Sequence, residues 1–356
     1  MSNGKILIAG AYGLAGRALY SAFRSHGLNV IAAGRSESKL QSLVQELGGE
    51  FRLLDAGAPD PEVLNSVDLL VNCVGPYLKL GQRMAEYAIQ AGCHYIDIAS
   101  EQEHFRRLQS LDAKARSAGV LLLTGAGAYP GISGLMLKQL MEKHPTGDSA
   151  ELFLAMGPNP PGEGIAQILT GALEMVFPLE EKYQGHLRSI VPGGLIARSL
   201  PRPFGDVELL RWPQMEILDL AGRSRIASIK TGLIHGSVEP ISPLQVWLVK
   251  MIRPDRWNWS YQLVTRMARK MSVEGSSDAA VEGCIVFGRV HDGDGWHECT
   301  LRARNTEEAT AALPTLLSKK IMAGGLADRG TRSPLDLISL DEWVALVETI
   351  GSVEWE

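Results

Sequence analysis

The chain has 356 residues, of which 45% are hydrophobic and 21% are charged, and this length suggests two domains at about 150 residues each. The composition excludes a disordered chain, and a chain of this size can build a core without disulfide or metal staples. The formal net charge is −5, from 35 basic and 40 acidic residues, and no run of Lys and Arg stands out. We therefore expect no nucleic-acid partner. The four cysteines form no C-x-x-C pair, which suits a reducing compartment.

The first 125 residues or so alternate short apolar runs with segments of helical periodicity. The predicted strands are residues 6–9, 29–33, 51–54, 69–73, 95–98 and 120–123. The predicted helices are residues 17–26, 38–47, 81–91 and 103–117. Apolar runs of this length are typical of strands that are buried on both faces. The alternation predicts right-handed βαβ crossovers and an open parallel sheet, the doubly wound architecture of a Rossmann domain.

After about residue 145 the pattern changes to short strands among many Gly and Pro residues. We predict a strand at 150–156, a helix at 165–176, a hairpin of 283–290 with 298–304, and a helix at 306–323. Residues 241–271 are expected to form two helices that Pro254 separates. The fold class is therefore α/β, with a Rossmann domain at 1–145 and an α+β domain on a largely antiparallel sheet at 146–325. Residues 326–356 are expected to pack back on the first domain.

A glycine-rich loop, G-x-x-G-x-x-G at residues 10–16, lies between the first strand and the first helix. Glycines there let the backbone approach a diphosphate, and the helix N-terminus supplies N–H groups and partial positive charge. The spacing departs by one residue from the G-x-G-x-x-G fingerprint, and a purely structural turn is the alternative. The predicted cofactor contacts in this loop are Gly10, Tyr12, Gly13, Leu14 and Gly16.

The end of the second strand indicates which dinucleotide is bound. A site for NAD would place Asp or Glu there, to accept hydrogen bonds from the ribose 2′-hydroxyl. This chain has Arg35 and Ser36, with Lys39 one turn later. A guanidinium offers planar, charge-assisted contacts to a 2′-phosphate, so we predict NADP(H) as the cofactor. The alternative is that Arg35 is only a solvated residue at a strand end.

Two later stretches extend the predicted cofactor site. Asp55 follows the third strand and is expected either to accept a hydrogen bond from the adenine amino group or to stabilise a turn. The fourth strand ends at residues 72–77, and loops beyond the carboxyl ends of strands line the ligand crevice in such sheets. A structural turn is again the alternative. The residues expected to face the cofactor here are Asn72, Val74, Gly75 and Pro76.

The chain resembles the saccharopine dehydrogenase-like family, most clearly over residues 4–137. The resemblance is carried by the glycines of residues 10–16, by V-N-C-V-G-P-Y at 71–77, by A-G-C-H-Y-I-D at 91–97 and by G-A-Y-P-G at 127–131. It implies an NAD(P)-binding Rossmann domain and a second domain that covers the cofactor and shapes the substrate site. The family includes reductases that form secondary amines from imines, and enoyl reductases that act on lipids or polyketides.

We therefore expect an NADPH-dependent oxidoreductase that reduces an imine of a small or carrier-linked substrate. The alternatives are an enoyl reductase of a carrier-bound lipid or polyketide, and a non-catalytic NADP(H)-binding sensor. The predicted catalytic residues are Tyr77, as a proton donor, and Tyr95 and Asp97, which match the fifth-strand motif of the family. Tyr77 could instead be a packing ring. Glu101, His104 and Tyr129 are further candidates, with Glu101 expected in a solvated loop and His104 at the surface.

The second domain offers less specific signals. Trp212, Trp247, Trp257 and Trp259 could line an apolar pocket, or belong to a core or a dimer contact. A basic stretch could attract an acidic substrate or carrier, or be a solvated helix face; it comprises Arg253, Arg256, Arg266, Arg269 and Lys270. His291 and His297 flank a turn without a convincing ligand set, so we expect no metal. No apolar run is long enough to span a membrane, and we expect a cytoplasmic homodimer.

Overall fold

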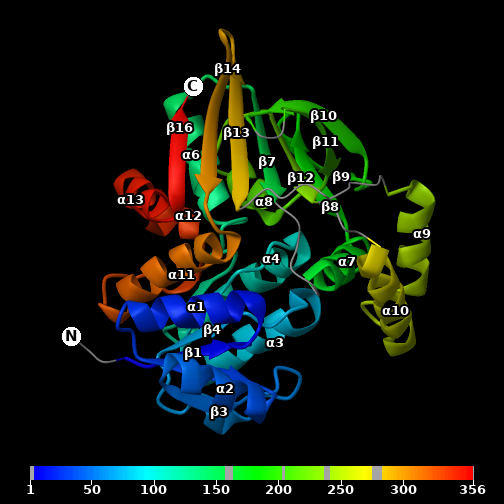
Figure 1. The fold of residues 1–356 in the computed structure, drawn as a ribbon. Helices are drawn as coiled ribbons and strands as arrows, with labels where there is room; N and C mark the ends of the chain where they lie inside the picture. Colours follow the sequence, from blue (N-terminus) through cyan, green and yellow to red (C-terminus); the bar gives the residue numbers. More distant parts are fainter. Residues whose placement is uncertain (1–3, 157–162, 203–204, 236–240, 275–282, 356) are drawn as a thin grey trace. The chain divides into compact units, whose positions relative to one another are not determined.

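A computed structural model describes residues 4–156, 163–202, 205–235, 241–274 and 283–355 (Figure 1). The chain forms two compact units, each assembled from several segments. Unit 1 comprises residues 1–100, 104–132 and 307–346, and unit 2 comprises residues 101–103, 133–306 and 347–356. The units therefore change over at residues 132 and 306, where the sequence pattern suggested 145 and 325.

Unit 1 is built on a sheet of seven parallel strands in the order β15-β6-β5-β4-β1-β2-β3. The strands are β1 (Ile6–Ala9), β2 (Val30–Gly34), β3 (Glu50–Leu53), β4 (Leu69–Asn72), β5 (His94–Asp97), β6 (Leu121–Leu123) and β15 (Gly330–Arg332). The central strand β1 pairs on both sides, with Ile6 opposite Val30 and Leu69. This is the doubly wound Rossmann sheet that the sequence predicts.

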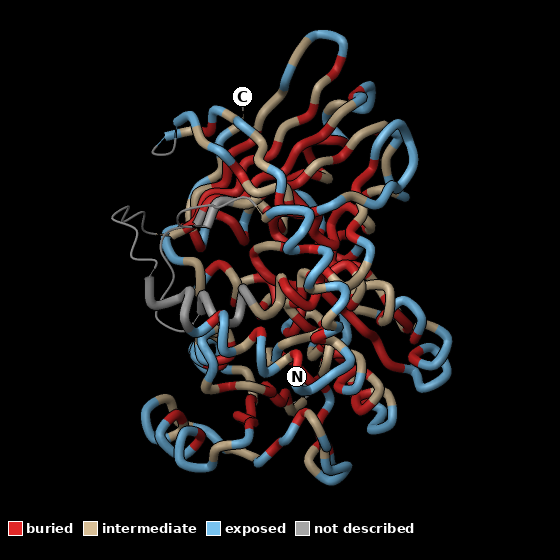
Figure 2. The backbone as a smooth tube through the Cα atoms, turned by 90° about the vertical axis from the view of Figure 1, so that its right-hand side faces the viewer, coloured by how far each residue is buried: buried red, intermediate tan, exposed pale blue. Residues whose placement is uncertain are grey.

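Helices cover both faces of this parallel sheet. The helices of unit 1 are α1 (Leu14–Ser25), α2 (Glu37–Leu47), α3 (Tyr77–Gln90), α4 (Gln102–Gln109), α5 (Asp112–Ser117) and α11 (Thr306–Met322), with a 3₁₀ turn at Pro61–Leu64. α12 (Pro334–Leu337) and most of α13 (Leu340–Ile350) also belong to this unit. One strand face packs Leu7, Ile31 and Tyr95 against α3, α4 and α5. The strands β1, β2, β4, β5 and β6 are buried almost throughout, which explains their apolar sequences, whereas the edge strand β3 is largely accessible; Figure 2 colours the backbone by burial.

The seventh strand comes from the far end of the chain. β15 pairs in parallel with β6, with Gly330 opposite Leu121. The Gly330 N–H donates to the carbonyl of Val120 at 2.8 Å, and the Thr331 N–H donates to Asp112 at 2.8 Å. A three-residue strand is too short to show a period in sequence, so the sequence analysis does not predict it.

Unit 2 is built on a mixed sheet of nine strands, in the order β10-β11-β12-β7-β13-β14-β16 with β8 and β9 attached to β12. The strands are β7 (Ser149–Met156), β8 (Leu179–Tyr183), β9 (His186–Ile190), β10 (Leu195–Leu200), β11 (Gly205–Arg211), β12 (Ser228–His235), β13 (Cys284–Asp292), β14 (Gly295–Ala303) and β16 (Gly351–Trp355). Its strand pairs are antiparallel except β7 with β12. The predicted hairpin is confirmed as β13 and β14, with a shorter turn than residues 291–295.

The helices that unit 2 adds are α6 (Ile132–Lys143), α7 (Glu163–Glu174), α8 (Met215–Ala221), α9 (Pro243–Ile252) and α10 (Asn258–Glu274). Ser242 and Gln245 form a reciprocal capping box at the start of α9. Arg253 adopts a left-handed conformation at the end of α9, and α10 follows after Pro254, as predicted. In the described part of the chain, no helix combines the length and apolarity needed to cross a bilayer.

Candidate functional site

The glycine-rich loop brings the first turn of α1 against the exit of β1. Gly10 has a φ of +80°, a conformation that other L-residues rarely adopt, and its N–H donates to the Ala33 carbonyl at 2.8 Å. A Cβ on Gly16 would lie 2.1 Å from the Gly10 carbonyl oxygen. Both glycines are therefore required by geometry, because no side chain fits between the helix and the strand exit.

The N-terminus of α1 is left open by this arrangement. Gly13 is the N-cap residue, so no side chain caps the helix, and the first turn contains no acidic residue. The Gly13 N–H donates to the Gly10 carbonyl at 2.9 Å, while the next amides point out of the helix end. Leu14, beside them, is 46% exposed. These N–H groups and the helix dipole make a site for an anion such as a diphosphate.

A cationic niche lies at the end of β2, next to this loop. The Tyr12 hydroxyl accepts a hydrogen bond from the Arg35 N–H at 3.2 Å, and the Lys39 ammonium lies 5.4 Å from the Tyr12 ring. A Cβ on Gly34 would meet this ring at 2.5 Å, so Gly34 makes room for it. Ser36 is the N-cap residue of α2 but makes no side-chain capping bond, and the side chains of Arg35 and Lys39 are exposed. The structure thus brings together the residues that we expect at a 2′-phosphate.

The remaining predicted cofactor residues have structural partners of their own. Asp55 is exposed and its carboxylate accepts a hydrogen bond from the Gly57 N–H at 2.9 Å, which gives it the turn role; its adenine contact stays a prediction. Asn72 is completely buried, and its amide oxygen accepts from the Val74 N–H at 3.0 Å. Asn72 therefore fixes the backbone of the loop that follows β4, through this hydrogen bond. Gly75 has open space around it.

Beneath this loop lies a buried hydrogen-bond network centred on Asp97. Its two oxygens accept bonds from side chains at 2.7–2.9 Å and from two backbone amides at 3.1–3.2 Å. The five donors are the Tyr95 hydroxyl, the His104 imidazole, the Thr124 hydroxyl, and the N–H groups of Ala99 and Gly125. Burial alone would raise the pKa of Asp97, but His104 and these hydrogen bonds hold it below its usual value.

His104 is therefore not the surface residue that we expected. It is fully buried, 2.7 Å from Asp97, and a Cβ on Gly81 would lie 2.3 Å from its ring. The helical position of His104 suggested exposure, but Asp97 supplies the buried partner that its imidazole needs. Gly81 supplies the space for the ring.

The predicted catalytic residues take different places around this network. Tyr95 and Asp97 are fully buried, and burial together with Asp97 raises the pKa of Tyr95 well above its usual value. The Tyr95 hydroxyl accepts from the Asn72 amide at 3.0 Å and donates to Asp97. Tyr77 is half-buried, its ring lies 5.4 Å from that of His104, and its hydroxyl donates to the Asn72 carbonyl at 3.0 Å. Tyr77 is thus the most accessible of the three.

Comparison with known proteins identifies this part of the chain. Residues 6–123 match the family model described as the saccharopine dehydrogenase NADP binding domain. The match spans about a third of the chain, and over that segment the chain is similar to this NADP-binding domain. The resemblance and the NADP(H) cofactor that the sequence predicts are thereby confirmed for this domain.

Curated proteins are similar over little more than a third of the chain. A Caenorhabditis elegans lipid droplet localized protein is 26% identical over 143 residues, which cover 36% of this chain and 34% of that protein. A Homo sapiens saccharopine dehydrogenase-like oxidoreductase is 27% identical over 158 residues, which cover 40% of this chain and 37% of that protein. The chain therefore matches only about a third of the length of these relatives.

The fold matches a solved dehydrogenase over its whole length. Saccharopine dehydrogenase (L-Glu forming) from Saccharomyces cerevisiae aligns with a TM-score of 0.66 and 12% identity, covering 99% of this chain and 100% of that one. At this identity the likeness shows a shared fold.

Unit 2 contains two buried carboxyl groups that the sequence did not single out. Glu174 accepts a hydrogen bond from the Trp212 indole at 2.9 Å, and burial, then the charge of Glu101, raises its pKa well above its usual value. Glu216 accepts a bond from the Ser133 hydroxyl, and burial raises its pKa to about 7. Such groups can hold a proton near neutral pH and are candidates for functional acids. Glu101 itself is 2% exposed, which corrects the expected solvated loop.

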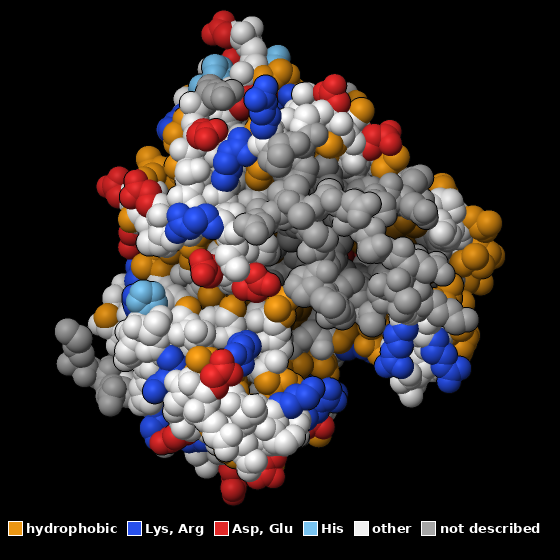
Figure 3. Space-filling model, in the orientation of Figure 1, with side chains coloured by type: hydrophobic (Ala, Val, Ile, Leu, Met, Phe, Trp, Pro, Cys, Tyr) orange, Lys and Arg blue, Asp and Glu red, His pale blue; other side chains and the backbone are white. Residues whose placement is uncertain are grey.

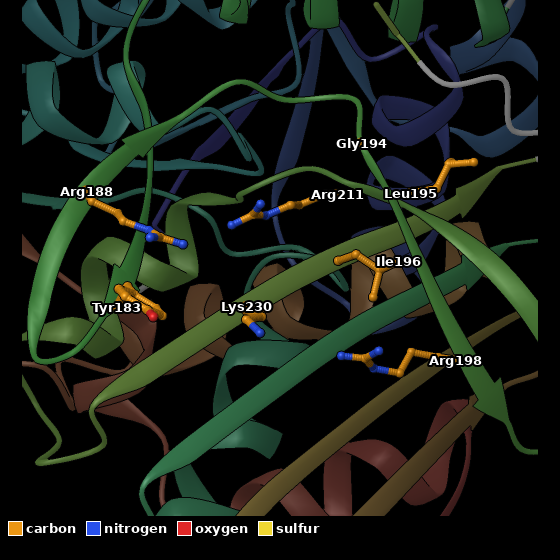
Figure 4. A pocket seen from close by; sticks show the side chains of 8 residues that line it. All are labelled: Tyr183, Arg188, Gly194, Leu195, Ile196, Arg198, Arg211 and Lys230. Carbon is orange, nitrogen blue, oxygen red and sulfur yellow. The ribbon is translucent and has the colours of Figure 1, made fainter.

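A small cavity of about 260 Å³ in unit 2 is rich in cationic side chains (Figure 4). Its lining residues are Tyr183, Arg188, Gly194, Leu195, Ile196, Arg198, Arg211 and Lys230. The buried Glu181 pairs with both Arg188 and Arg211, and Glu151 pairs with Arg198. These two carboxylates offset at most half of the charge of the four cationic lining side chains, and we assign no ligand to the cavity.

His297 of the β13–β14 hairpin and the distant His144 lie at the same carboxylate. His297 lies 2.8 Å from Asp292, and His144, 148 residues upstream of Asp292, lies 3.5 Å from the same carboxylate. The three donor atoms are close enough for one metal ion. However, the two imidazoles stack at 3.6 Å and 16°. Because imidazole lone pairs lie in the ring plane, stacked rings do not direct them at one ion. We therefore assign no metal to this cluster.

The tryptophans of unit 2 separate into two kinds. Trp212 is buried against Met175, Leu179 and Val246. Trp247, Trp257 and Trp259 are instead 49–60% exposed, on or next to α9 and α10. Tyr129, in unit 1, is half-buried. Of these four tryptophans, only Trp212 is the buried pocket or core residue that we considered.

Replacing Gly16 with Ala should abolish the close contact of α1 with β1. The new Cβ would overlap the Gly10 carbonyl oxygen, and overpacking of this kind destabilises a protein by about 1–3 kcal/mol. We expect NADPH affinity to fall more than tenfold, measured by fluorescence titration. Gly222→Ala, where a Cβ meets open space, is the matched control. Unchanged affinity in Gly16→Ala would contradict the loop geometry.

Glu216 should make the stability of the protein depend on pH. Its folded pKa of about 7 lies above the usual unfolded value of about 4.3, so the folded state binds the proton more tightly. The stabilisation is complete below about pH 4 and is lost as the pH rises through 7. Between pH 5 and pH 8 this loss lowers the free energy of unfolding, measured by urea titration, by an amount on the order of 2–3 kcal/mol, and Glu216→Gln should remove that part of the pH dependence. The exposed Glu348→Gln should retain the wild-type slope.

Proposed function

We propose that the protein is an NADPH-dependent oxidoreductase that reduces an imine of a small or carrier-linked substrate. The observation that carries this proposal is the open N-terminus of α1 beside the cationic niche of Arg35 and Lys39. The first can bind a diphosphate and the second a 2′-phosphate, and both lie in a domain of the NADP-binding type. The substrate class follows from the resemblance to saccharopine dehydrogenase-like reductases.

The residues present fit NADP(H). Gly10 and Gly16 let α1 start directly against the exit of β1, so that the uncapped N–H groups of its first turn are available to a diphosphate. Arg35, Ser36 and Lys39 would hold the 2′-phosphate, with the Tyr12 ring between loop and strand end. Asp55 would contact the adenine, and Val74, Gly75 and Pro76 would contact the nicotinamide half.

The bound cofactor supplies the hydride, and the protein positions the acceptor and provides a proton. We assign the role of proton donor to the Tyr77 hydroxyl. This hydroxyl would exchange its hydrogen bond to the Asn72 carbonyl for one to the substrate nitrogen, to which it gives its proton. His104 lies against the Tyr77 ring, and Asp97 holds His104 in place. Tyr95 and Asp97, which do not reach the surface, are then positioning residues for Asn72, His104 and Tyr77.

The same cofactor site would also serve an enoyl reductase or a sensor of NADP(H). An enoyl reductase would use the same cofactor site on a carrier-bound lipid or polyketide, and a sensor would bind NADP(H) without turnover. We also propose a homodimer in the cytoplasm with small-molecule or carrier-linked substrates. Nothing in the charge distribution of the chain favours nucleic acid.

Replacing Arg35 with Asp should discriminate between the two nicotinamide cofactors. The variant loses charge-assisted hydrogen bonds to the 2′-phosphate and places a carboxylate against it, so NADPH affinity should fall at least about tenfold. NADH affinity should change little, and both are measured by calorimetric titration. Lys114→Asp makes the same charge change on an exposed position of α5 and should affect neither. Equal losses for the two cofactors would rule out the 2′-phosphate contact.

Oxidation of NADPH on addition of candidate imines and enoyl thioesters tests the reaction itself. We expect turnover with an imine, and Tyr77→Phe should lower kcat by about 10²-fold or more while cofactor affinity is kept. Turnover only with carrier-bound enoyl thioesters would support the enoyl alternative. Tight cofactor binding without turnover across the panel would support the sensor. Unchanged kcat in Tyr77→Phe would return Tyr77 to a packing role.

A further inference from the structure

Unit 2 exposes an apolar surface that its own fold does not cover. This surface, the α9–α10 face, consists of eight large side chains, each 42–64% exposed: Leu244, Trp247, Leu248, Met251, Trp257, Trp259, Leu263 and Met267. Figure 3 shows apolar side chains gathered in this region beside Lys and Arg. A contiguous exposed apolar surface on a soluble domain indicates a site of interaction.

The spacing of these residues shows that both helices turn an apolar stripe to solvent. On α9 the exposed positions 244, 247, 248 and 251 recur at intervals of three and four and so share one helix face. Val246 and Val249 lie on the other face, packed with Met175, Leu179 and Trp212. A helix on the outside of a globular unit ordinarily presents polar residues there. α9 is apolar on both its inner and its outer face.

α10 repeats the pattern. Trp259, Leu263 and Met267 are exposed at intervals of four residues. The adjacent positions Ser260, Val264 and Ala268 are buried, also at intervals of four, and α10 packs against α7. The inner face is therefore already occupied by the fold, and the outer apolar face is additional to it.

Basic side chains accompany this apolar face. Between residues 243 and 269 the chain has five exposed basic residues and one acidic residue, Asp255. The basic residues are Lys250, Arg253, Arg256, Arg266 and Arg269. This segment is thus locally cationic in a protein whose formal net charge is −5. The charge favours an anionic partner. It disfavours a second copy of the chain, because a symmetric dimer contact would bring the same basic residues together.

We propose that the α9–α10 face docks on the surface of an anionic lipid bilayer, with both helices lying in the interface plane. Exposed Trp, Leu and Met would enter the boundary between headgroups and acyl chains, where the amphipathic indole is favoured. The Lys and Arg side chains would contact the anionic headgroups, each contributing electrostatic attraction. Amphipathic helices of this composition bind at the interface without spanning the membrane.

Vesicle flotation of the purified full chain tests this proposal directly. We expect binding to phosphatidylcholine vesicles that contain phosphatidylglycerol, accompanied by a blue shift of tryptophan fluorescence. Binding should weaken when salt is added, because salt screens the headgroup attraction. Equal binding to vesicles of phosphatidylcholine alone would overturn the electrostatic part of the proposal. No binding to either kind of vesicle would overturn it entirely.

Two variants separate the apolar and the electrostatic contributions. Trp247→Ser with Trp259→Ser should weaken the partition coefficient more than tenfold, since burying one large apolar side chain is worth about 1.5–3 kcal/mol. Lys250→Gln with Arg266→Gln should weaken it by about 25-fold, at roughly fivefold for each charge. Trp296→Ser, which removes a tryptophan that is 41% exposed on the β13–β14 hairpin, is the matched control and should bind as the wild type.

The oligomeric state provides the competing outcome. If the wild type ignores vesicles and the double tryptophan variant converts a dimer into a monomer in light scattering, the face is a contact between copies and the proposal is wrong. All substituted side chains are exposed, so the melting temperature should not change. NADPH affinity, which belongs to unit 1, should also be retained. The result is therefore independent of the reaction that the protein catalyses.

Discussion

The contact between the Gly16 backbone and the Gly10 carbonyl determines how close α1 comes to β1. That contact fixes where the free amides of the helix end lie, because Gly16 is in the first turn of α1, which begins at Leu14. Tyr12 lies in the same loop, and its ring packs on Gly34 at the end of β2. The anion site and the cationic niche are therefore consequences of one close approach. A single added methyl group at residue 16 would displace both.

The buried Asp97 network holds the same edge of the sheet from below. A carboxylate out of water is tolerated only when its oxygens are fully hydrogen-bonded, and here five donors from β5, α4 and residues 99–125 meet that requirement. The network reaches Asn72 through Tyr95, so it connects the loop after β4 to the loop after β6. Such a preformed edge lets a cofactor bind with little ordering of the protein.

Sequence patterns predicted the parallel sheet well because six of its seven strands carry a local signal. Alternating strand and helix periods located β1 to β6, and the glycine loop located the uncapped N-terminus of α1. The patterns failed where a property depends on a distant residue. His104 is buried because of Asp97 and Gly81, and the pKa of Glu216 is raised by its burial. Two helices begin at residues 14 and 77, three to four residues before the predicted starts at 17 and 81. The loop glycines and Pro76 are typical of turns, so the sequence placed these residues outside the helices. β15 is too short to show a pattern at all.

Arginine, lysine and aromatic side chains occur together at the end of β2 and again on α9 and α10, and their burial differs between the two places. At the end of β2 the Tyr12 ring lies over Gly34 and carries the Lys39 ammonium, so the cations are ordered around one small space. On α9 and α10 the aromatic rings themselves are exposed, and the cations surround them over two helix faces. The first arrangement suits a compact phosphate and the second an extended anionic surface. A sequence shows the same residue types in both. Only the exposure of each ring, which depends on the fold, separates a ligand niche from a docking face.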